Sequence, residues 1–357
     1  MNFDYNEQQQ LLADSVRRYL AKSYDFEARK KIVAGEGWSA QAWAQFAEMG
    51  LTGLPFSAEH GGFGGGAVDL MGVLEAFGEA LVVEPYLPLV LAGRALERGG
   101  SAALKARVVP GVIEGRARLA LAHVEKGTRY AIDAVRASAQ KNPSGWSVSG
   151  EKAAVIGAPT AQHLVVSAKA DGAVQLFLVE TARAELRPHR TMDERLAADV
   201  ALRGVAAEPL QGGQQLLEEL VDLGTALVCA EAVGAMKFAC ETTLEYLKTR
   251  KQFGVPIGTF QALQHRIVEM FISLEQARSM ACLAASKADA GADPRSISAA
   301  KIKIADAARH VSQEAVQLHG GMGMSDELKV SHAFRRLTVL AREFGDADHH
   351  LERFAKL

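Results

Sequence analysis

Two short motifs in the second half of the chain carry side chains that could bind a phosphate-bearing ligand. Residues 250–254 read Arg-Lys-Gln-Phe-Gly, and residues 317–324 read Gln-Leu-His-Gly-Gly-Met-Gly-Met. A guanidinium group pairs with phosphate through two parallel hydrogen bonds, and glycine lets another group approach the backbone closely. Both motifs also have a structural reading, because cations and glycines are common at the C-terminal ends of helices.

Long helices are expected to position these motifs. Apolar residues recur at helical spacing in the last third of the chain, and Gly291 with Asp293-Pro294 supplies a helix stop and the next start. The pattern predicts a bundle of four antiparallel helices. These expected helices cover residues 226–250, 260–290, 296–319 and 327–357.

The earlier part of the chain has two different patterns. Helical periodicity is expected in residues 4–22, 40–49 and 68–99. From about residue 107, short alternating or apolar runs are separated by Gly, Pro, Asn and Asp, which predicts a compact β unit of about six to eight strands. The expected strands include residues 135–139, 146–150, 163–168 and 174–180, and the unit ends near residues 202–205. The predicted domains are therefore 1–107 (helical), 108–208 (β-barrel) and 209–357 (four-helix bundle).

Composition excludes several classes of protein. The 357 residues have 48% hydrophobic and 23% charged side chains and a net charge of −2, so nothing predicts binding to nucleic acid or to a membrane. The first residues lack a secretory signal pattern, which indicates a cytoplasmic protein. Cys229, Cys240 and Cys282 have no metal or redox spacing and are expected to be buried thiols, so no metal site is predicted.

With both motifs in a helix–barrel–helix chain, the sequence resembles the acyl-CoA dehydrogenase family over nearly its whole length. Residues 250–264 (Arg-Lys-Gln-Phe-Gly-Val-Pro-Ile-Gly-Thr-Phe-Gln-Ala-Leu-Gln) and 315–323 (Ala-Val-Gln-Leu-His-Gly-Gly-Met-Gly) are similar to its two C-terminal motifs. Residues 148–152 and 192–200 resemble its barrel. The implied fold is mainly α with a central β unit: an N-terminal helical domain, a middle β-barrel and a C-terminal four-helix bundle.

The resemblance implies a flavoenzyme in which FAD extends across a subunit interface. The residues implied to hold the adenosine and pyrophosphate end of a neighbour's FAD are Arg250, Gln252, Phe253, Gln317, Gly320 and Gly321. The implied reaction is α,β-desaturation of an acyl-CoA, with a carboxylate as base and flavin as hydride acceptor. Electrons would then pass to an electron-transfer flavoprotein, and the chain would be an oligomer.

The catalytic carboxylate of the family is missing from both of its usual positions. With Arg336 aligned on the family's arginine, Gly345 stands where the usual Glu would be, and the position used by a minority of members falls near Gly224. Asp346 is the nearest carboxylate and is the candidate base; its other reading is a helix cap. Glu231 lies among apolar helix residues, where we favour a paired carboxylate over a functional one.

The barrel departs from the family as well. The flavin-ring contacts of the family, a Thr-Glu-Pro strand end and a Trp-Ile-Thr/Ser segment, align with His123-Val-Glu-Lys126 and Ala154-Val-Ile156. These replacements are expected to lose the ring contacts, while the site for the FAD tail is kept. The combination resembles the small subunit of bacterial heteromeric acyl-CoA dehydrogenases of the pimeloyl-CoA or steroid side-chain type, which work with a larger catalytic subunit.

Three alternatives remain open at this point. The chain could form a self-sufficient homo-oligomeric dehydrogenase with Asp346 as base. It could be a flavin-dependent oxidase or monooxygenase on the same fold. It could also be a non-catalytic partner subunit. The length and type of the acyl chain are not encoded in any of these patterns.

Overall fold

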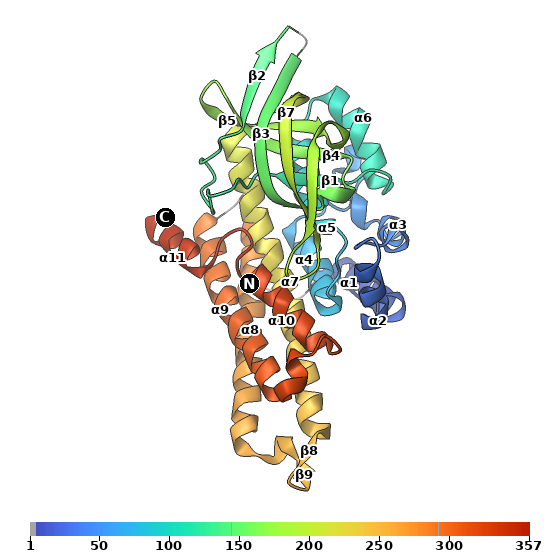
Figure 1. Cartoon of the computed structure of the whole chain (residues 1–357), viewed down its shortest axis with the longest axis vertical. Helices are drawn as coiled ribbons and strands as arrows, with labels where there is room; N and C mark the ends of the chain where they lie inside the picture. The colour runs from blue at the N-terminus through green and yellow to red at the C-terminus, as the bar shows by residue number, and fades with distance from the viewer. Residues whose placement is uncertain (1–4, 144, 292) are drawn as a thin grey trace. The chain divides into compact units, whose positions relative to one another are not determined.

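The computed structural model describes residues 5–143, 145–291 and 293–357 (Figure 1). The described residues divide into two compact units. The first contains residues up to Lys30, 67–82 and 225–357, and the second contains residues 31–66 and 83–224. The first unit holds both sequence motifs, and the second holds the β unit.

The first unit is built from long helices. Several begin at residues that satisfy free backbone N–H groups: Asn6 and Gln9 form a capping box, and Asp293 accepts from the N–H of Ser296 with Pro294 in the first turn. The helices are α1 (Glu7–Ser23), α2 (Phe26–Ala34), α4 (Ala67–Ala80), α7 (Gly213–Thr249), α8 (Gln261–Asp289), α9 (Pro294–His319), α10 (Lys329–Leu340) and α11 (Ala347–Lys356). Parts of α2 and α7 belong to the second unit.

Helix α7 is the core helix of the bundle. It is long and apolar enough to cross a membrane, but 83% of its most apolar window is buried inside the structure, as in the central helix of a soluble bundle. Its Gly234 lies against the Glu75 carbonyl of α4, and Gly78 of α4 lies against the Glu231 carbonyl of α7. A Cβ at either glycine would clash with backbone, so this pair of glycines sets how closely the two helices pack.

The helix expected at 327–357 is two helices, and that prediction was wrong. Helix α10 ends at Leu340 and α11 begins at Ala347. Between them Phe344 has φ 60° and Gly345 has φ 122°, a backbone conformation that an α-helix cannot contain. The first bundle helix also differs from its prediction, because it begins at Gly213 rather than at 226.

The second unit contains a closed β-barrel. Strands β4, β2, β3, β7 and β5 pair in that order and β5 pairs back with β4, while β1 joins β4 and β6 joins β7. The β1–β4 and β2–β4 pairs are parallel and the other pairs are antiparallel. The strands are β1 (Leu119–Ala122), β2 (Ser138–Asn142), β3 (Gly145–Ile156), β4 (His163–Ala170), β5 (Ala173–Glu180), β6 (Glu185–Arg190) and β7 (Leu196–Leu210).

One predicted strand begins later in the chain than expected. The alternation at 135–139 predicted a strand there, but β2 begins at Ser138. The backbone N–H groups of Arg136 and Ala137 instead donate to the carboxylate of Glu125, at 2.8 and 3.0 Å. A side chain thus takes the hydrogen bonds that a strand partner would have made.

The remaining elements are helices packed in the second unit and short 3₁₀ turns in both. The helices are α3 (Ala40–Glu48), α5 (Tyr86–Gly99) and α6 (Ala102–Ile113). The 3₁₀ turns are η1 (Leu51–Gly53), η2 (Ala58–His60), η3 (Ala158–Thr160), η4 (Thr181–Arg183), η5 (Ile257–Thr259) and η6 (Gly320–Met324).

Candidate functional site

The two sequence motifs meet at one end of the helical bundle. The ring of Tyr246, near the end of α7, stacks on the ring of His319, the last residue of α9, with centroids 4.4 Å apart and planes 27° apart. His319 Nδ1 lies 2.8 Å from the Ala315 carbonyl, which fixes the ring along the helix. Because Arg250 follows one turn after Tyr246 and Gly320 follows His319, both motifs leave their helices side by side.

The first motif folds into a tight hairpin that the sequence did not predict. Strands β8 (Lys251–Gln252) and β9 (Val255–Pro256) pair around a two-residue turn in which Phe253 has φ 54° and Gly254 has φ 80°. Positive φ at both central residues is the turn type that matches the twist of a hairpin, and it is unfavourable for phenylalanine. The Phe253 side chain is 92% exposed. The hairpin therefore presents a large apolar ring to whatever lies beyond this chain.

Arg250 and Gln252 are also exposed on this hairpin. Among the described residues, the Arg250 guanidinium makes no hydrogen bond or ion pair, although its backbone N–H donates to Tyr246 O at 2.8 Å. Gln252 Nε2 bonds only to the neighbouring Lys251 carbonyl at 2.8 Å. Both side chains keep donors that a ligand could use.

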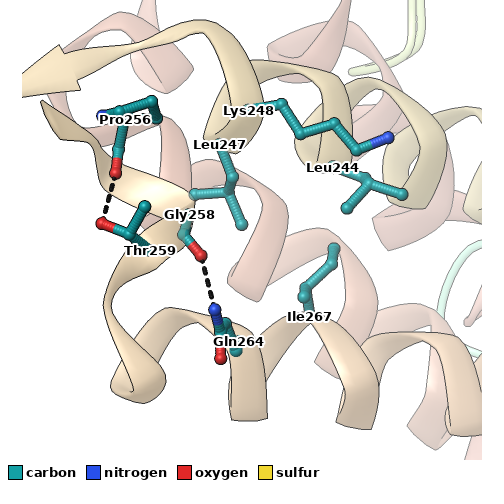
Figure 2. Close-up of a pocket in the computed structure, with 8 residues that line it drawn as sticks. All are labelled: Leu244, Leu247, Lys248, Pro256, Gly258, Thr259, Gln264 and Ile267. Atoms are coloured by element: carbon teal, nitrogen blue, oxygen red, sulfur yellow. Dashed lines mark hydrogen bonds between the residues drawn. The ribbon is translucent and has the colours of Figure 1, made fainter.

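A cavity of about 410 Å³ lies behind the hairpin, between α7 and α8 (Figure 2). Its wall is held by two hydrogen bonds of 2.8 Å, from Thr259 Oγ1 to Pro256 O and from Gln264 Nε2 to Gly258 O. Leu244 and Leu247 of α7 and Ile267 of α8 project into the space between the two helices in Figure 2. The lining residues are Leu244, Leu247, Lys248, Pro256, Gly258, Thr259, Gln264 and Ile267.

The glycines of the second motif have three different roles. Gly320 has φ 61°, so its backbone conformation favours glycine. Gly323 packs against Val316, where an added Cβ would lie 2.6 Å from a carbonyl oxygen. Gly321 has neither constraint, since its φ is not positive and a Cβ there would meet open space. Gln317 is exposed beside it. Of the three glycines in this motif, Gly321 alone is not required by any contact or backbone angle in the described part of the chain.

Gly345, the residue aligned with the family's carboxylate, has no room for a side chain unless its neighbours shift. A Cβ on Gly345 would lie 2.5 Å from His350 Nε2 and 2.7 Å from His349 Cδ2, and its φ of 122° strains every other residue. His350 is buried, lies 3.0 Å from Phe344 O through Nε2 and 3.3 Å from Ser298 Oγ through Nδ1. Burial and the nearby Lys301 charge lower the pKa of His350 to about 3. The neutral ring of His350 thus fills the space beside Gly345.

Asp346 is the N-cap of α11. Its Oδ1 accepts from the His349 backbone N–H at 2.9 Å, and its side chain is half-buried. This is the capping role that the sequence offered as the other reading of Asp346. Gly224, the second position considered for a base, lies buried within α7.

Glu231 is paired, as we favoured from the sequence. It forms a buried ion pair with Arg336 of α10, and Arg336 also donates to the Val82 carbonyl at 2.8 Å. A buried carboxylate with such a partner needs no catalytic explanation.

Sequence reasoning missed Lys301, which lies fully buried in α9. Its ammonium donates to the Leu340 carbonyl at the end of α10, and burial lowers its pKa. The sequence contained a signal for this burial, because Lys301 lies between Ile297 and Ile304 on the apolar face of α9. Lys301 caps the end of the helix that precedes the Gly345 turn, so it is a structural support of that region.

In the barrel, the two stretches aligned with flavin-ring contacts lie next to each other. The backbone N–H of Ala153 donates to Val124 O at 2.8 Å. Beneath them Lys152 is completely buried and donates to Glu125 Oε1 at 2.7 Å, Ser167 Oγ at 3.0 Å and His123 O at 3.2 Å. His123 Nδ1 lies 2.9 Å from Ser167 Oγ. The network ties both stretches to the barrel interior.

The pKa values of the three titratable groups in this network are all lowered, for different reasons. Burial lowers the pKa of Lys152 to about 8 in spite of Glu125, and burial together with the Lys152 charge lowers that of His123 to about 4. Burial alone would raise the pKa of Glu125, but hydrogen bonds from Lys152 and from the N–H groups of Ala137 and Arg136 hold it below its ordinary value. His123 is therefore neutral, and Glu125 is ionised at neutral pH.

Comparison with known proteins gives family matches at both ends of the chain. Residues 6–116 match the model of the acyl-CoA dehydrogenase N-terminal domain, and residues 211–356 match that of the C-terminal domain. Acyl-CoA dehydrogenase IpdE2 of Mycolicibacterium smegmatis is 29% identical, with 98% of each chain covered.

Two solved structures have the same fold over the whole chain. A chain of the ChsE4–ChsE5 complex from Mycobacterium tuberculosis is 25% identical with a TM-score of 0.92, covering 100% of this chain and 98% of that one. PigA with FAD and proline is 26% identical with a TM-score of 0.90 and the same coverage.

Proposed function

Because this chain belongs to the acyl-CoA dehydrogenase family of FAD-dependent oxidoreductases acting on CH–CH bonds, we propose that it is the small subunit of a heteromeric dehydrogenase. The assembly would convert an acyl-CoA thioester to the 2-enoyl-CoA. The observation that carries the proposal is the turn at Gly345, where a side chain would clash with His350 and His349 and the φ of 122° favours glycine. The partner chain would supply the base.

The hairpin and the end of α9 fit the adenosine and pyrophosphate end of FAD. Arg250 offers an exposed guanidinium that pairs with no other described residue and could bind a phosphate, and Phe253 offers an exposed ring for stacking. Gly321 leaves space for close approach to the backbone. When bound, the flavin of FAD accepts the hydride. Arg250, Gln252, Phe253, Gln317, Gly320 and Gly321 would hold the tail and so orient a flavin that lies in the neighbouring subunit.

Exposed apolar side chains near this site support an assembly. Val268, Phe271 and Ile272 project from α8 at spacings of three and four residues, and Leu244 of α7 and Phe260 are also exposed. A stripe of this kind on a helix is what a partner chain covers. The related chain in the ChsE4–ChsE5 complex comes from an assembly of two different proteins, which supports a heteromer here. We propose an electron-transfer flavoprotein as the electron acceptor and the cytoplasm as the location.

The test compares the chain alone with the chain co-expressed with other acyl-CoA dehydrogenase chains of the same genome. We expect the chain alone to show no acyl-CoA oxidation and a co-purifying pair to bleach its flavin with a panel of acyl-CoAs. Arg250→Ala should lower the flavin content of the pair at least tenfold, because one charge-assisted phosphate contact contributes about 1.5–3 kcal/mol. Arg187→Ala, which removes an exposed arginine of the barrel, is the matched control.

Other outcomes of this test distinguish the alternatives. Full activity and stoichiometric FAD in the isolated chain would contradict the heteromer and favour a homo-oligomer with Asp346 as base. Rapid oxygen consumption by the reduced flavin would favour an oxidase or monooxygenase. A co-purifying pair without flavin would leave the chain as a non-catalytic partner.

A further inference from the structure

The imidazole of His332 in α10 lies buried between two arginine side chains. Its Nδ1 is 3.2 Å from Arg29 Nη1 and 3.0 Å from Arg335 Nη2. A guanidinium group has only donors and is not deprotonated in proteins, so Nδ1 accepts from both. The ring proton is then on Nε2, which lies 3.0 Å from the Asp326 carbonyl and donates to it. The contacts of the two ring nitrogens thus require the same neutral tautomer.

This ring joins three segments of the first unit. Arg29 belongs to α2, is 2% exposed, and also donates through Nε to Leu81 O at 2.7 Å. Phe26, one turn earlier in α2, packs edge-on against the imidazole with ring centroids 4.9 Å apart. Asp326 lies in the turn of residues 325–328, between η6 and α10. One uncharged imidazole therefore holds α2, α10 and this turn together.

The turn at 325–328 is also bonded to the second sequence motif. The backbone N–H of Ser325 donates to Met322 O of η6 at 3.1 Å, and Ser331 Oγ of α10 donates to Ser325 O at 2.8 Å. Hydrogen bonds thus lead from α10 through the turn to η6, which contains both glycines proposed to hold the FAD tail. A change of charge on His332 can reach that segment although the imidazole touches no ligand.

A proton on Nδ1 would break this arrangement. It removes the acceptor that Arg29 and Arg335 share, and it places a third positive charge between their guanidinium groups. The acids of the adjoining elements each pair with a lysine or an arginine. Besides the two arginines, the charged side chains of the elements that meet at the ring are Glu27, Lys30, Glu79, Asp326, Glu327 and Lys329.

We propose that His332 is an acid-sensitive latch of this chain. Histidine is the side chain whose charge ordinarily changes between about pH 5 and pH 8. While the ring is neutral, it holds α2 and the 325–328 turn against α10. When Nδ1 takes up a proton, the two guanidinium groups lose their shared acceptor, and α2 and the turn are released together.

The consequence for the cofactor rests on the proposed function. In the proposed heteromer η6 holds part of the tail of FAD, so release of the turn that follows it lowers the affinity for FAD. Acidification then empties the tail site, although the Arg250 guanidinium keeps its charge. His332 is a positioning residue in this arrangement, because it acts on the cofactor only through the turn.

Hydrogen–deuterium exchange of the assembled protein at about pH 7.5 and about pH 5.5 tests the latch. Exchange rates are converted to protection factors, which removes the effect of pH on the intrinsic exchange rate. Protection of residues 26–30 and 325–332 should fall about tenfold at the lower pH, since a hydrogen bond to a charged group contributes at least that factor. In addition, ¹⁵N NMR of the histidine rings at neutral pH should show His332 protonated at Nε2.

Three variants assign the effect to this ring. His332→Asn keeps an acceptor near the position of Nδ1 but takes up no proton in this range, so its protection should be the same at both pH values. Arg335→Gln removes one of the two charges beside Nδ1 and should open at a lower pH, which keeps the test decisive if His332→Asn does not fold. His189→Asn, at an exposed histidine of β6, should respond as the unaltered protein does.

Titration with FAD, with flavin absorbance as the readout, tests the link to the cofactor. The unaltered assembly should bind FAD several-fold more weakly at the lower pH, whereas His332→Asn should bind it equally at both. The same loss of affinity in both proteins, or a loss of protection without a loss of affinity, overturns the inference.

The remaining outcomes separate this inference from the proposed function. An Nδ1–H tautomer at neutral pH, or equal protection at both pH values in the unaltered protein, overturns the latch and leaves the proposed function standing. An assembly that binds no FAD at the higher pH overturns the proposed function and with it the link to the cofactor, while the exchange measurement still decides whether the latch exists.

Discussion

The ring of Tyr246 lies flat against that of His319, 4.4 Å away, and this stack joins the end of α7 to the end of α9. The residues proposed to hold the tail of FAD lie close to these two residues in the sequence, with Arg250 four residues after Tyr246 and Gln317 and Gly320 on either side of His319. The distance between the Arg250 hairpin and the Gly320 turn therefore depends on a contact that involves no ligand-binding residue.

The first prediction concerns this stack. Tyr246→Ala should weaken FAD binding by the assembled protein several-fold and lower the melting temperature, because an aromatic pair contributes about 0.5–1.5 kcal/mol beyond its buried area. Tyr246→Phe is the matched control, since it keeps the ring. Flavin fluorescence titration and thermal unfolding measure the two effects. Equal FAD affinity and equal melting temperature in the Ala and Phe variants would show that the stack does not position the FAD-tail site.

The second prediction separates the two roles of Asp346. Asp346→Asn should retain stability, because asparagine caps a helix as well as aspartate, whereas Asp346→Ala should cost about 1 kcal/mol. If the partner chain supplies the base, turnover of the assembly should be the same in Asp346→Asn as in the unaltered protein. Steady-state oxidation of an acyl-CoA measures this. A thousandfold loss in the Asn variant would identify Asp346 as the base.

The third prediction concerns the closed turn. Gly345→Glu should not create an active isolated subunit. It should instead destabilise the chain by on the order of 3 kcal/mol, because the new Cβ meets His350 Nε2 and the backbone has φ 122°. Gly321→Ala, in open space, should unfold at the same denaturant concentration as the unaltered chain. Acyl-CoA oxidation by isolated Gly345→Glu would contradict this account of the turn.

The fourth prediction tests the contact between α4 and α7. Gly78→Ala should destabilise the protein by about 1–3 kcal/mol, since the added methyl group meets the Glu231 carbonyl. Gly111→Ala in α6 is the control, because its nearest neighbour would lie 3.7 Å away. Alanine has a higher helix propensity than glycine, so Gly111→Ala should be as stable as the unaltered protein or up to about 1 kcal/mol more stable. Urea denaturation measures both.

The fifth prediction is a pH dependence from His350. Its pKa is about 3 in the folded chain and about 6.5 when unfolded. Because the folded-state pKa is lowered, the unfolded chain binds the extra proton, and stability is lost as pH falls from about 6.5 towards 3. The expected loss between pH 7 and pH 5 is about 2 kcal/mol for this residue.

His350→Gln should have a shallower dependence of unfolding free energy on pH, whatever its stability at pH 7. The residues that face the imidazole are Ser298, Lys301, Phe344, His349 and Arg353. His189→Gln, at an exposed site, should keep the slope of the unaltered protein. Equal slopes in all three proteins would contradict the burial of a neutral His350.

Local signals in the sequence predicted much of the helical structure. Asp293 and Pro294 marked the start of α9, and the apolar surroundings of Glu231 indicated its ion pair. The closed barrel followed from the alternation of its strands and from the family resemblance. These features depend on adjacent residues or on the regular spacing of apolar residues, and both can be recognised in a single sequence.

The break between α10 and α11 could not be predicted in the same way. Residues 327–357 have helix-compatible composition, and the turn at Phe344 and Gly345 is held by His350, Ser298 and Lys301, which come from other helices. The positive φ of Phe253 could not be predicted either, because phenylalanine rarely adopts a positive φ. Tertiary contacts decide such positions, and periodicity contains no information about them.

The turn at Gly345 also limits which substitutions could introduce a catalytic carboxylate at this position. A carboxylate at this position requires a new backbone conformation, a different residue in place of His350 and a new partner for Ser298. Each change alone leaves a clash or an unpaired buried group. A single Gly345→Glu exchange therefore does not give this chain a base at that position, and under the proposed heteromer a base in the partner chain is easier to keep than to replace.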